Sequence, residues 1–469
     1  MKWKVIILIL FSAMLIGMMV ACGNDSNNAG ADENNDEPEA NETENNNENN
    51  NEVNDSEEAG DSEPVTIRLH HWYNTEQDNW DVVIDAFEAE HPHIKVESIT
   101  PENNDANETM QQIDLAAASG DDLDAIIVND AANYSQRVSQ GMFEPLNQYL
   151  DDNGIDYEEE YGVDTSVDGD YYALPGKFNG FFVMLNQDAL EENGLDVPEE
   201  WTWDEYMEYA EILSEGEGSD RRYGTFFHTW TDYLKLAAFN QHEDSNLIKD
   251  DGVTSNVDSD RIRQSLEIRQ RGHEEDSATP YADTISLDLN YRPQFFGGSA
   301  AMIMTGTWMI NDSGGVEEGT EFTTAFAPYP QAQEGDPITS PSGADFMAMY
   351  SGSEHKDEVF EFLRWYTTEG IVTQSKFLPD FQGVDMEEVV NNLLEESDVN
   401  VDLINMESLI HTLEVQEAAA LSIPPAFISE VETAYSGEVE RFLLDEQDLE
   451  TTIENAHEAV QNVIDQNVE

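Results

Sequence analysis

Residues 65–99 read VTIRLHHWYNTEQDNWDVVIDAFEAEHPHIKVESI, and two hydrophobic periodicities alternate along them. Residues 65–69 alternate apolar and polar side chains, which predicts a strand with one buried face. Within residues 80–87 the apolar side chains recur at i, i+3, i+4 and i+7, which predicts an amphipathic helix. Residues 94–99 alternate again. The stretch therefore predicts a strand–helix–strand unit.

The ends of the helix in this unit carry local signals. Thr75 and Asp78 resemble a capping box, in which a hydroxyl and an acidic side chain three positions later satisfy free backbone N–H groups. Pro92 is expected to end the helix, because proline lacks the N–H that a helix interior needs.

The same alternation continues down the chain. The pattern predicts a helix over residues 108–119 closed by Gly120, a strand over residues 124–128, and a further helix that ends near Gly141. This β-α-β-α-β-α order predicts the α/β class, with a parallel sheet covered by helices.

A second α/β section begins near residue 177. About 400 folded residues exceed what one hydrophobic core usually holds, so two lobes are expected. The expected elements are strands at 181–185, 300–305 and 346–350, a helix started by the capping box of Thr202 and Glu205, a helix over 356–369 stopped by Gly370, and mainly helical structure from Met386 onward.

The first 22 residues form a separate feature. Two lysines precede an apolar run over residues 5–20, which is the layout of a secretory signal peptide. A retained transmembrane anchor is the alternative, but the run is shorter than the roughly 20 apolar residues that span a bilayer. The sequence Met19-Val20-Ala21-Cys22 is similar to a bacterial lipobox. We therefore expect residues 1–21 to be removed and Cys22 to carry a lipid that anchors the protein to the membrane.

Residues 22–64 are a low-complexity stretch of Asn, Glu, Asp, Gly and Ser. They contain too little apolar surface to offset the entropy of ordering, so the stretch is predicted to be a disordered acidic tether. Cys22 is the only cysteine, which excludes a disulfide within the chain.

The charge is extreme, with 101 Asp and Glu against 19 Lys and Arg and a formal net charge of −82. Self-repulsion on this scale destabilises a compact chain unless salt screens it, which predicts a salt-loving or alkaliphilic source. The scarcity of Lys and Arg argues against a nucleic-acid partner, because binding phosphates requires them. Scattered carboxylates leave calcium binding open, although no D-x-[DN]-x-[DN]-G loop is present.

Two histidine pairs, His70-His71 and His91-Pro92-His93, suggest a metal site. They lack the i, i+4 spacing and cysteine partners of zinc sites, so no metal or other cofactor is predicted. The chain has no G-x-S-x-G, no P-loop and no dinucleotide fingerprint. Carboxylate pairs for glycoside hydrolysis cannot be recognised among so many acidic residues.

Taken in order, the motifs resemble the family 1 extracellular solute-binding proteins, from residue 65 to about residue 465. The matching stretches are residues 65–72, 87–96, 124–127, 141–146, 169–175, 185–188, 201–205 and 296–308. The resemblance implies a two-lobed fold of the type II periplasmic-binding-protein kind, in which hinge-linked lobes close around a ligand.

The resemblance also implies how the chain is divided between the lobes. The N-terminal lobe is expected to contain residues 65–175 and 328–380, and the C-terminal lobe residues 176–327 and 381–469. The chain would cross between them near residues 173–176, 325–330 and 378–383.

The candidate site residues follow from sugar chemistry, because a neutral sugar needs aromatic platforms for its ring and planar polar groups for its hydroxyls. Trp72, Tyr73 and Asn74 follow the first strand and Asp130 follows the third, at the carboxyl edge where open α/β sheets bind ligands. Core packing is the alternative explanation for the aromatic pair, and a helix N-cap is the alternative for Asp130.

Further candidates lie in the second section. Lys177, Phe178 and Asn179 follow the first crossing, and Lys177 is one of few cations, although a surface ion pair is the alternative. The resemblance adds Trp230 and Trp308, where relatives place aromatic side chains that stack on sugar. Asp345 is expected on a loop that faces the cleft.

The resemblance implies a substrate-binding component of an ABC importer. Such a protein captures a mono- or oligosaccharide and delivers it to a membrane permease, without catalysis and as a monomer. It would work lipid-anchored on the extracellular face of a Gram-positive, halophilic or alkaliphilic bacterium. The alternatives are a lipid-anchored secreted glycoside-processing enzyme and a purely structural surface lipoprotein that binds no ligand.

Overall fold

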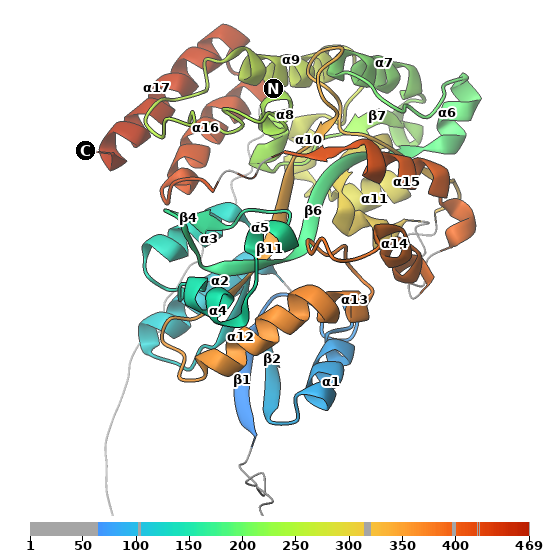
Figure 1. Ribbon diagram of the computed structural model, residues 1–469. Helices are drawn as coiled ribbons and strands as arrows, with labels where there is room; N and C mark the ends of the chain where they lie inside the picture. The colour runs from blue at the N-terminus through green and yellow to red at the C-terminus, as the bar shows by residue number, and fades with distance from the viewer. Residues whose placement is uncertain are drawn as a thin grey trace, which may run out of the picture. The chain divides into compact units, whose positions relative to one another are not determined.

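The computed structural model of the protein describes residues 64–101, 105–313, 320–395, 400–419, 421 and 423–468. The predicted signal peptide, the predicted lipidation site Cys22 and the predicted tether up to residue 63 lie outside these residues. Strands and helices alternate along the described chain, which confirms the predicted α/β class (Figure 1). None of the helices in these ranges has the length and apolar character needed to cross a membrane.

The first part of the chain forms three strands, two connecting helices and a third helix: β1 (Val65–His70), α1 (Trp80–Glu90), β2 (Ile94–Ile99), α2 (Ala106–Ser119), β3 (Ala125–Val128) and α3 (Ala131–Ser139). The strands are parallel in the order β2-β1-β3, with Val65 opposite Ile94 and Leu69 opposite Ala125. This confirms the predicted parallel β-α-β-α-β unit. Gly120 ends α2 with a φ of 78°, as predicted.

The sheet is completed by strands from later in the chain: β6 (Ala173–Asn186), β7 (Tyr223–Phe226), β8 (Ala300–Gly306), β9 (Thr324–Ala327) and β11 (Ser342–Met349). The order is β2-β1-β3-β11-β6-β8-β7, and β9 also pairs with β6. Because β11 is antiparallel to β3 and β6 is antiparallel to both β11 and β8, the sheet is mixed.

Strand β6 connects the two halves of this sheet (Figure 1). Its first half pairs with β11, and its second half pairs with β8 and β9. A third segment lies along β6, since Phe178 N donates to Leu378 O at 2.8 Å and Asp380 N donates to Gly176 O at 3.0 Å. The region around residues 176–180 is therefore where three chain segments run side by side.

The remaining elements are mostly helical: α4 (Asn147–Asn153), α5 (Tyr157–Glu160), β4 (Ser166–Val167), β5 (Asp170–Tyr171), α6 (Gln187–Asn193), α7 (Trp203–Leu213), α8 (Leu236–Phe239), α9 (Asp260–Glu274), α10 (Tyr281–Ser286), α11 (Tyr291–Phe296), β10 (Thr339–Ser340), α12 (Lys356–Trp365), α13 (Ile371–Gln374), α14 (Met386–Glu395), α15 (Met406–Val415), β12 (Glu417–Ala418), α16 (Ile428–Leu443) and α17 (Leu449–Asn467). From Met386 onward the described chain is mainly helical, as predicted.

Separate hydrophobic clusters cover the two halves of the sheet. One cluster joins Ile67 of β1 to Leu363 of α12, and another joins Val183 of β6 to Trp201. The predicted N-terminal lobe includes residues 328–380. Tyr329 and Ala332, at the start of this range, pack in the cluster that contains Trp201. The predicted lobe boundaries themselves stay predictions.

The two predicted capping boxes have different outcomes. Thr202 and Glu205 form one at the start of α7, where Thr202 N donates to the Glu205 carboxylate at 2.8 Å. The prediction for Thr75 and Asp78 is wrong. Helix α1 begins after Asn79, whose φ is 55°. The backbone carbonyl of Thr75, and not its side chain, accepts a hydrogen bond from Trp80 N at 2.8 Å.

The prediction that Gly370 stops a helix is also wrong. Helix α12 passes into a π-helical turn at Tyr366–Gly370 and continues as α13 until Ser375, which has a φ of 51°. Gly370 keeps a helical φ of −65°, but a Cβ there would lie 2.6 Å from the Trp365 ring. The glycine is therefore required by packing within the helix and not by its end.

Candidate ligand-binding cleft

A cavity of about 1680 Å³ lies where the sheet changes from one half to the other. Residues from early and late segments of the chain line it, which is the arrangement expected of a ligand cleft. Eight of the ten predicted site residues line this cavity: Trp72, Tyr73, Asp130, Lys177, Asn179, Trp230, Trp308 and Asp345. Their role in binding stays a prediction.

The topology explains why distant residues meet here. Trp72 and Tyr73 follow the carboxyl end of β1, and Asp130 follows the carboxyl end of β3. Because these strands are parallel neighbours, their carboxyl ends lie at the same edge of the sheet. Lys177 and Asn179 come from the middle of β6, and Asp345 comes from β11 beside it.

Four of these side chains form one polar network. Lys177 Nζ donates to the Tyr73 hydroxyl at 2.8 Å, and that hydroxyl donates to Asp345 Oδ2. Asn179 Nδ2 donates to Asp345 Oδ1 at 3.0 Å, and Lys177 Nζ lies 3.4 Å from Asp345 Oδ2. The network is enclosed, because the side chains of Lys177 and Asp345 are 11% and 4% exposed. The alternative of a surface ion pair for Lys177 is therefore wrong.

The environment of Tyr73 keeps its hydroxyl protonated. Burial, and then the neighbouring charge of Asp345, raise the pKa of Tyr73 well above its usual value. A neutral hydroxyl donates one hydrogen bond and accepts another, so Tyr73 links the cation to the carboxylate. Lys177 Nζ also lies 4.9 Å from the centre of the Phe377 ring, close enough for a cation–π contact.

A bulge brings the charged pair together. In the pairing of β6 with β11, Ala344 lies opposite Phe178 and Phe346 lies opposite Pro175, so the register shifts between them. Asp345 alone therefore faces two residues of β6, Gly176 and Lys177. A bulge of this kind bends the strand and redirects a side chain.

Aromatic rings form the other part of the lining. The Trp230 ring centre lies 6.2 Å from that of Trp308 and 5.6 Å from that of Tyr291. Trp230 is 39% exposed, so part of its ring is open to the cavity. Gly306 permits this arrangement, because a Cβ there would lie 2.1 Å from the Trp308 ring. The Gly-Thr-Trp order thus allows Trp308 to fold back over β8.

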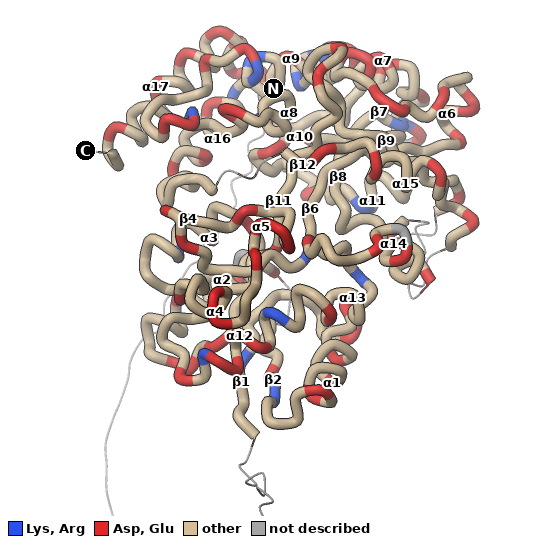
Figure 2. Tube along the Cα trace, viewed as in Figure 1, with Lys and Arg blue, Asp and Glu red and all other residues tan. Residues whose placement is uncertain are grey.

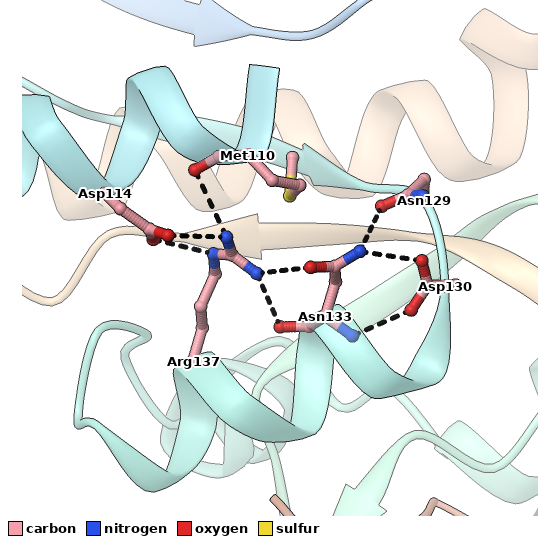
Figure 3. Close-up of polar contacts among 6 residues, drawn as sticks. All are labelled: Met110, Asp114, Asn129, Asp130, Asn133 and Arg137. Atoms are coloured by element: carbon pink, nitrogen blue, oxygen red, sulfur yellow. Dashed lines mark hydrogen bonds and ion pairs between the residues drawn. The ribbon is translucent and has the colours of Figure 1, made fainter. Parts of the chain in front are cut away.

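Asp130 lines the cavity and also caps a helix (Figure 3). Its Oδ1 accepts from Asn133 N at 2.7 Å and its Oδ2 accepts from Asn133 Nδ2 at 2.7 Å, at the start of α3. Arg137 donates to Asn133 Oδ1 at 2.8 Å and forms an ion pair with Asp114 at 2.9 Å. The helix N-cap interpretation is therefore confirmed, and both oxygens of Asp130 are already in use.

Two predicted site residues do not line the cavity. Asn74 is exposed, and its Oδ1 accepts from the backbone N–H groups of Glu76 and Gln77 at 3.1 and 2.9 Å. Phe178 instead packs against the cluster that contains Leu378. Alternate residues of a strand face opposite sides, so Lys177 and Asn179 face the cavity while Phe178 does not.

Further charged residues line the cavity without having been predicted as site residues: Glu76, Asp78, Asp105, Asp232, Lys235, Arg292, Asp312, Lys376 and Glu432. Arg292 Nε pairs with Asp312 Oδ2 at 2.7 Å, and its guanidinium lies 4.9 Å from the Tyr291 ring centre. Burial raises the pKa of Glu432, an effect that the nearby Lys235 opposes. The scarcity of cations that singled out Lys177 applies equally to Arg292, Lys235 and Lys376 and could have identified them.

The two histidine pairs contribute to packing and to ion pairing. The buried His71 ring stacks on Trp80 at 4.9 Å, and burial lowers its pKa to about 3. His93 Nε2 lies 3.4 Å from Glu361, which also contacts His91. Among the described residues no group of three or more His, Cys, Asp or Glu side chains could hold a metal ion.

Comparison with known proteins defines the class of this chain. The family model for bacterial extracellular solute-binding proteins matches residues 73–372, so the chain belongs to that family. This confirms the family that the sequence motifs resemble.

Solved structures of this class share the fold at low sequence identity. A sugar transporter protein from Rhizobium etli, in an open conformation, has a TM-score of 0.69 at 20% identity and covers 85% of this chain and 99% of its own. An ABC substrate-binding protein from Listeria monocytogenes, in complex with cycloalternan, has a TM-score of 0.69 at 18% identity. The match covers 86% of this chain and 100% of the Listeria chain. UgpB from Mycobacterium tuberculosis, in complex with glycerophosphocholine, has a TM-score of 0.68 at 17% identity. The match covers 87% of this chain and 100% of UgpB. The fold is thus the two-lobed one of these binding proteins.

Proposed function

We propose that this solute-binding protein captures a neutral sugar in the cleft and delivers it to the permease of an ABC importer. The observation that carries the proposal is that Trp72, Trp230 and Trp308 line the same cavity as the network of Lys177 and Asp345. Aromatic faces suit the apolar side of a sugar ring, and fixed carboxylate, amide and ammonium groups suit its hydroxyls.

The charge of the lining favours a neutral ligand over an anionic one. Eight carboxylates line the cavity but only four cations, Lys177, Lys235, Arg292 and Lys376. Each of the first three cations already has an acidic neighbour, respectively Asp345, Asp232 and Asp312. A phosphate ester would therefore meet more repulsion than attraction. For this reason we prefer a sugar to a ligand such as the glycerophosphocholine bound by UgpB.

A binding role without catalysis is part of the same proposal. Two central carboxylates of the lining are engaged structurally: Asp130 caps α3, and Asp345 holds the network of Tyr73, Lys177 and Asn179. A glycosidase needs one carboxyl group free to donate a proton and a second free to attack or to activate water. The glycoside-processing enzyme is accordingly the less favoured alternative.

Anchoring at the membrane is a further part of the proposal. It rests on Cys22 after the apolar run and on the acidic tether that follows. A diacylglycerol on Cys22 would supply the two acyl chains that stable anchoring needs. Metabolic labelling with a radioactive fatty acid, with Cys22→Ser as the control, tests this part separately. Equal labelling of both proteins would contradict it.

Isothermal titration of the protein with a panel of mono- and oligosaccharides tests the binding role. We expect one saturable site for a neutral sugar and recovery of that sugar unchanged, as judged by chromatography after prolonged incubation. Release of shorter sugars would favour the enzyme. Binding of glycerophosphocholine or a polyamine, with no response to any sugar, would show that the proposed ligand class is wrong.

A further inference from the structure

A second cavity, of about 350 Å³, lies between α9, α10 and the turn that joins α16 to α17. It shares no lining residue with the ligand cleft. Its walls include Phe227, Tyr281 and Phe442, and its polar lining includes Arg269 of α9 and Thr279 before α10.

Arg269 is a buried cation without a carboxylate partner among the described residues. The residue is 5% exposed, and its one hydrogen bond there runs from NH1 to Tyr233 O at 2.9 Å. The guanidinium lies 4.8 Å from the Phe227 ring centre and 5.9 Å from that of Tyr281. A guanidinium has five N–H donors, so most of its hydrogen-bonding capacity is unused by these contacts.

The surroundings of Arg269 do not supply its missing charge. Burial lowers the pKa of Arg269 to about 10, and the groups that oppose this shift are tyrosine hydroxyls, with Tyr281 first. Buried charges in proteins are normally paired, because removing them from water is costly. An unpaired arginine is unexpected in a chain with 101 acidic residues.

Thr279 gives an independent indication in the same cavity. Its hydroxyl oxygen is buried and has no hydrogen-bond partner among the described residues. A buried hydroxyl without a partner is also unfavourable, because it has lost its hydrogen bonds to water. Arg269 and Thr279 thus line one small cavity, and neither has a carboxylate partner among the described residues.

The acidic side chains around this cavity are engaged elsewhere. Glu274 Oε1 accepts from Gln270 Nε2 at 2.8 Å, and Asp448 Oδ1 accepts from Thr451 N at 2.8 Å at the start of α17. The side chain of Asp445 is 74% exposed and lies 3.4 Å from His273. None of the three pairs with Arg269 in the described structure.

We propose that this cavity binds a small monovalent anion, a halide or a carboxylate, on the unused N–H groups of Arg269 with Thr279 as a further donor. Either anion supplies the negative charge and the acceptor that the two side chains lack. The proposal is independent of the sugar proposed for the cleft.

The position of Arg269 determines which readout is informative. Through Phe227 and the carbonyl of Tyr233, Arg269 contacts both ends of the segment that carries Trp230 into the cleft. A substitution at Arg269 can therefore disturb the cleft through structure alone. The test must consequently measure the anion and not the sugar.

The experiment measures broadening of the chloride-35 NMR line by the wild-type protein, with sodium acetate as a competitor. We expect excess broadening in wild type, and a loss of most of it in Arg269→Gln. Arg271→Gln is the matched control, since Arg271 lies on the same helix but pairs with Glu275 at 2.8 Å, and it should behave as wild type. Thr279→Val should weaken the interaction several-fold while leaving the charge intact.

The outcomes separate the two sources of anion. Broadening that acetate does not displace assigns the site to a halide, whereas displacement shows that a carboxylate also fits. No broadening in wild type, together with no acetate-dependent rise in its melting temperature relative to Arg269→Gln, would overturn the proposal. If Arg269→Gln does not fold, wild-type crystals soaked in bromide decide: an anomalous peak at the guanidinium supports the site, and its absence overturns it.

Discussion

Lys177 and Asp345 face each other across a bulge between β6 and β11, with Nζ and Oδ2 3.4 Å apart and both side chains nearly enclosed. Strand β6 connects the two halves of the sheet, and β11 pairs with its first half. One buried ion pair thus lines the ligand cleft and links β6 to β11, two of the three chain segments that run side by side there.

Lys177→Met should lower both stability and ligand affinity. Removing the cation leaves the carboxylate of Asp345 buried and uncompensated, which typically costs about 3 kcal/mol or more. Lys356→Met is the control, because Lys356 pairs with Glu144 at 2.7 Å while both side chains are about 30% exposed. Such an exposed pair should contribute less than about 1 kcal/mol. Equal losses in chemical denaturation would show that the Lys177 pair has no special role.

Trp230→Ala should weaken sugar binding by tenfold or more, about 1.4 kcal/mol, with little change in stability. The ring is 39% exposed, so its removal leaves only a small cavity in the protein itself. Tyr209→Ala is a suitable control, since Tyr209 lies outside the cleft lining. Titration calorimetry gives the affinities, and an unchanged value for Trp230→Ala would remove this residue from the site.

Trp308→Ala should lose affinity and stability together. Unlike Trp230, the Trp308 side chain packs against two hydrophobic clusters and meets Phe181 edge-on at 5.1 Å. Its truncation is therefore expected to cost a few kcal/mol of folding free energy as well as at least tenfold in affinity. Trp308→Phe should restore most of the stability. Full affinity in Trp308→Ala would contradict its predicted contact with the ligand.

Periodicity and strand order predicted much of the fold and of the cleft, and local geometry explains the errors. The sequence predicts that the residues after β1 and β3 meet at one edge of the sheet, and Tyr73 and Asp130 do lie there. The same argument predicts Asn74 beside them, but its side chain bonds to its own turn. A single sequence does not show whether a short polar side chain will bond locally or face a cleft.

Two other features needed the three-dimensional structure. The bulge that pairs Lys177 with Asp345 depends on a register shift between strands that are far apart in sequence. Gly370 resembles a helix stop in the sequence, but its backbone is helical and its missing side chain makes room for Trp365. Glycine indicates either a special φ or a close approach, and only the fold distinguishes the two.

Asp380 should make stability depend on pH in an unusual direction. It is 1% exposed beside β6, accepts from Gly162 N at 2.9 Å, and burial raises its pKa to about 6. Between about pH 4 and 6 the folded state holds a proton that the unfolded state has released. The contribution of Asp380 to the free energy of unfolding is therefore largest below about pH 4 and decreases as pH rises to 6.

Asp380→Asn isolates this contribution, because the amide does not titrate. Relative to wild type, the variant should gain stability between pH 4 and 7, on the order of 1–3 kcal/mol. The exposed Asp152→Asn is the control for general charge effects. A difference between Asp380→Asn and wild type that stays constant across this range would be incompatible with a raised pKa.

Salt should stabilise the protein strongly. Acidic residues occur in most of the described helices while basic ones are few (Figure 2), in keeping with the formal net charge of −82. Repulsion between these carboxylates destabilises the folded state, and the screening length falls from about 10 Å at 0.1 M salt to about 3 Å at 1 M. Salt also weakens attractive ion pairs, but only 19 Lys and Arg are available to form them.

The melting temperature should therefore rise with NaCl. A rise that wild type and Arg269→Gln share measures screening apart from any specific anion. A flat or falling curve would show that repulsion does not limit the stability of this fold.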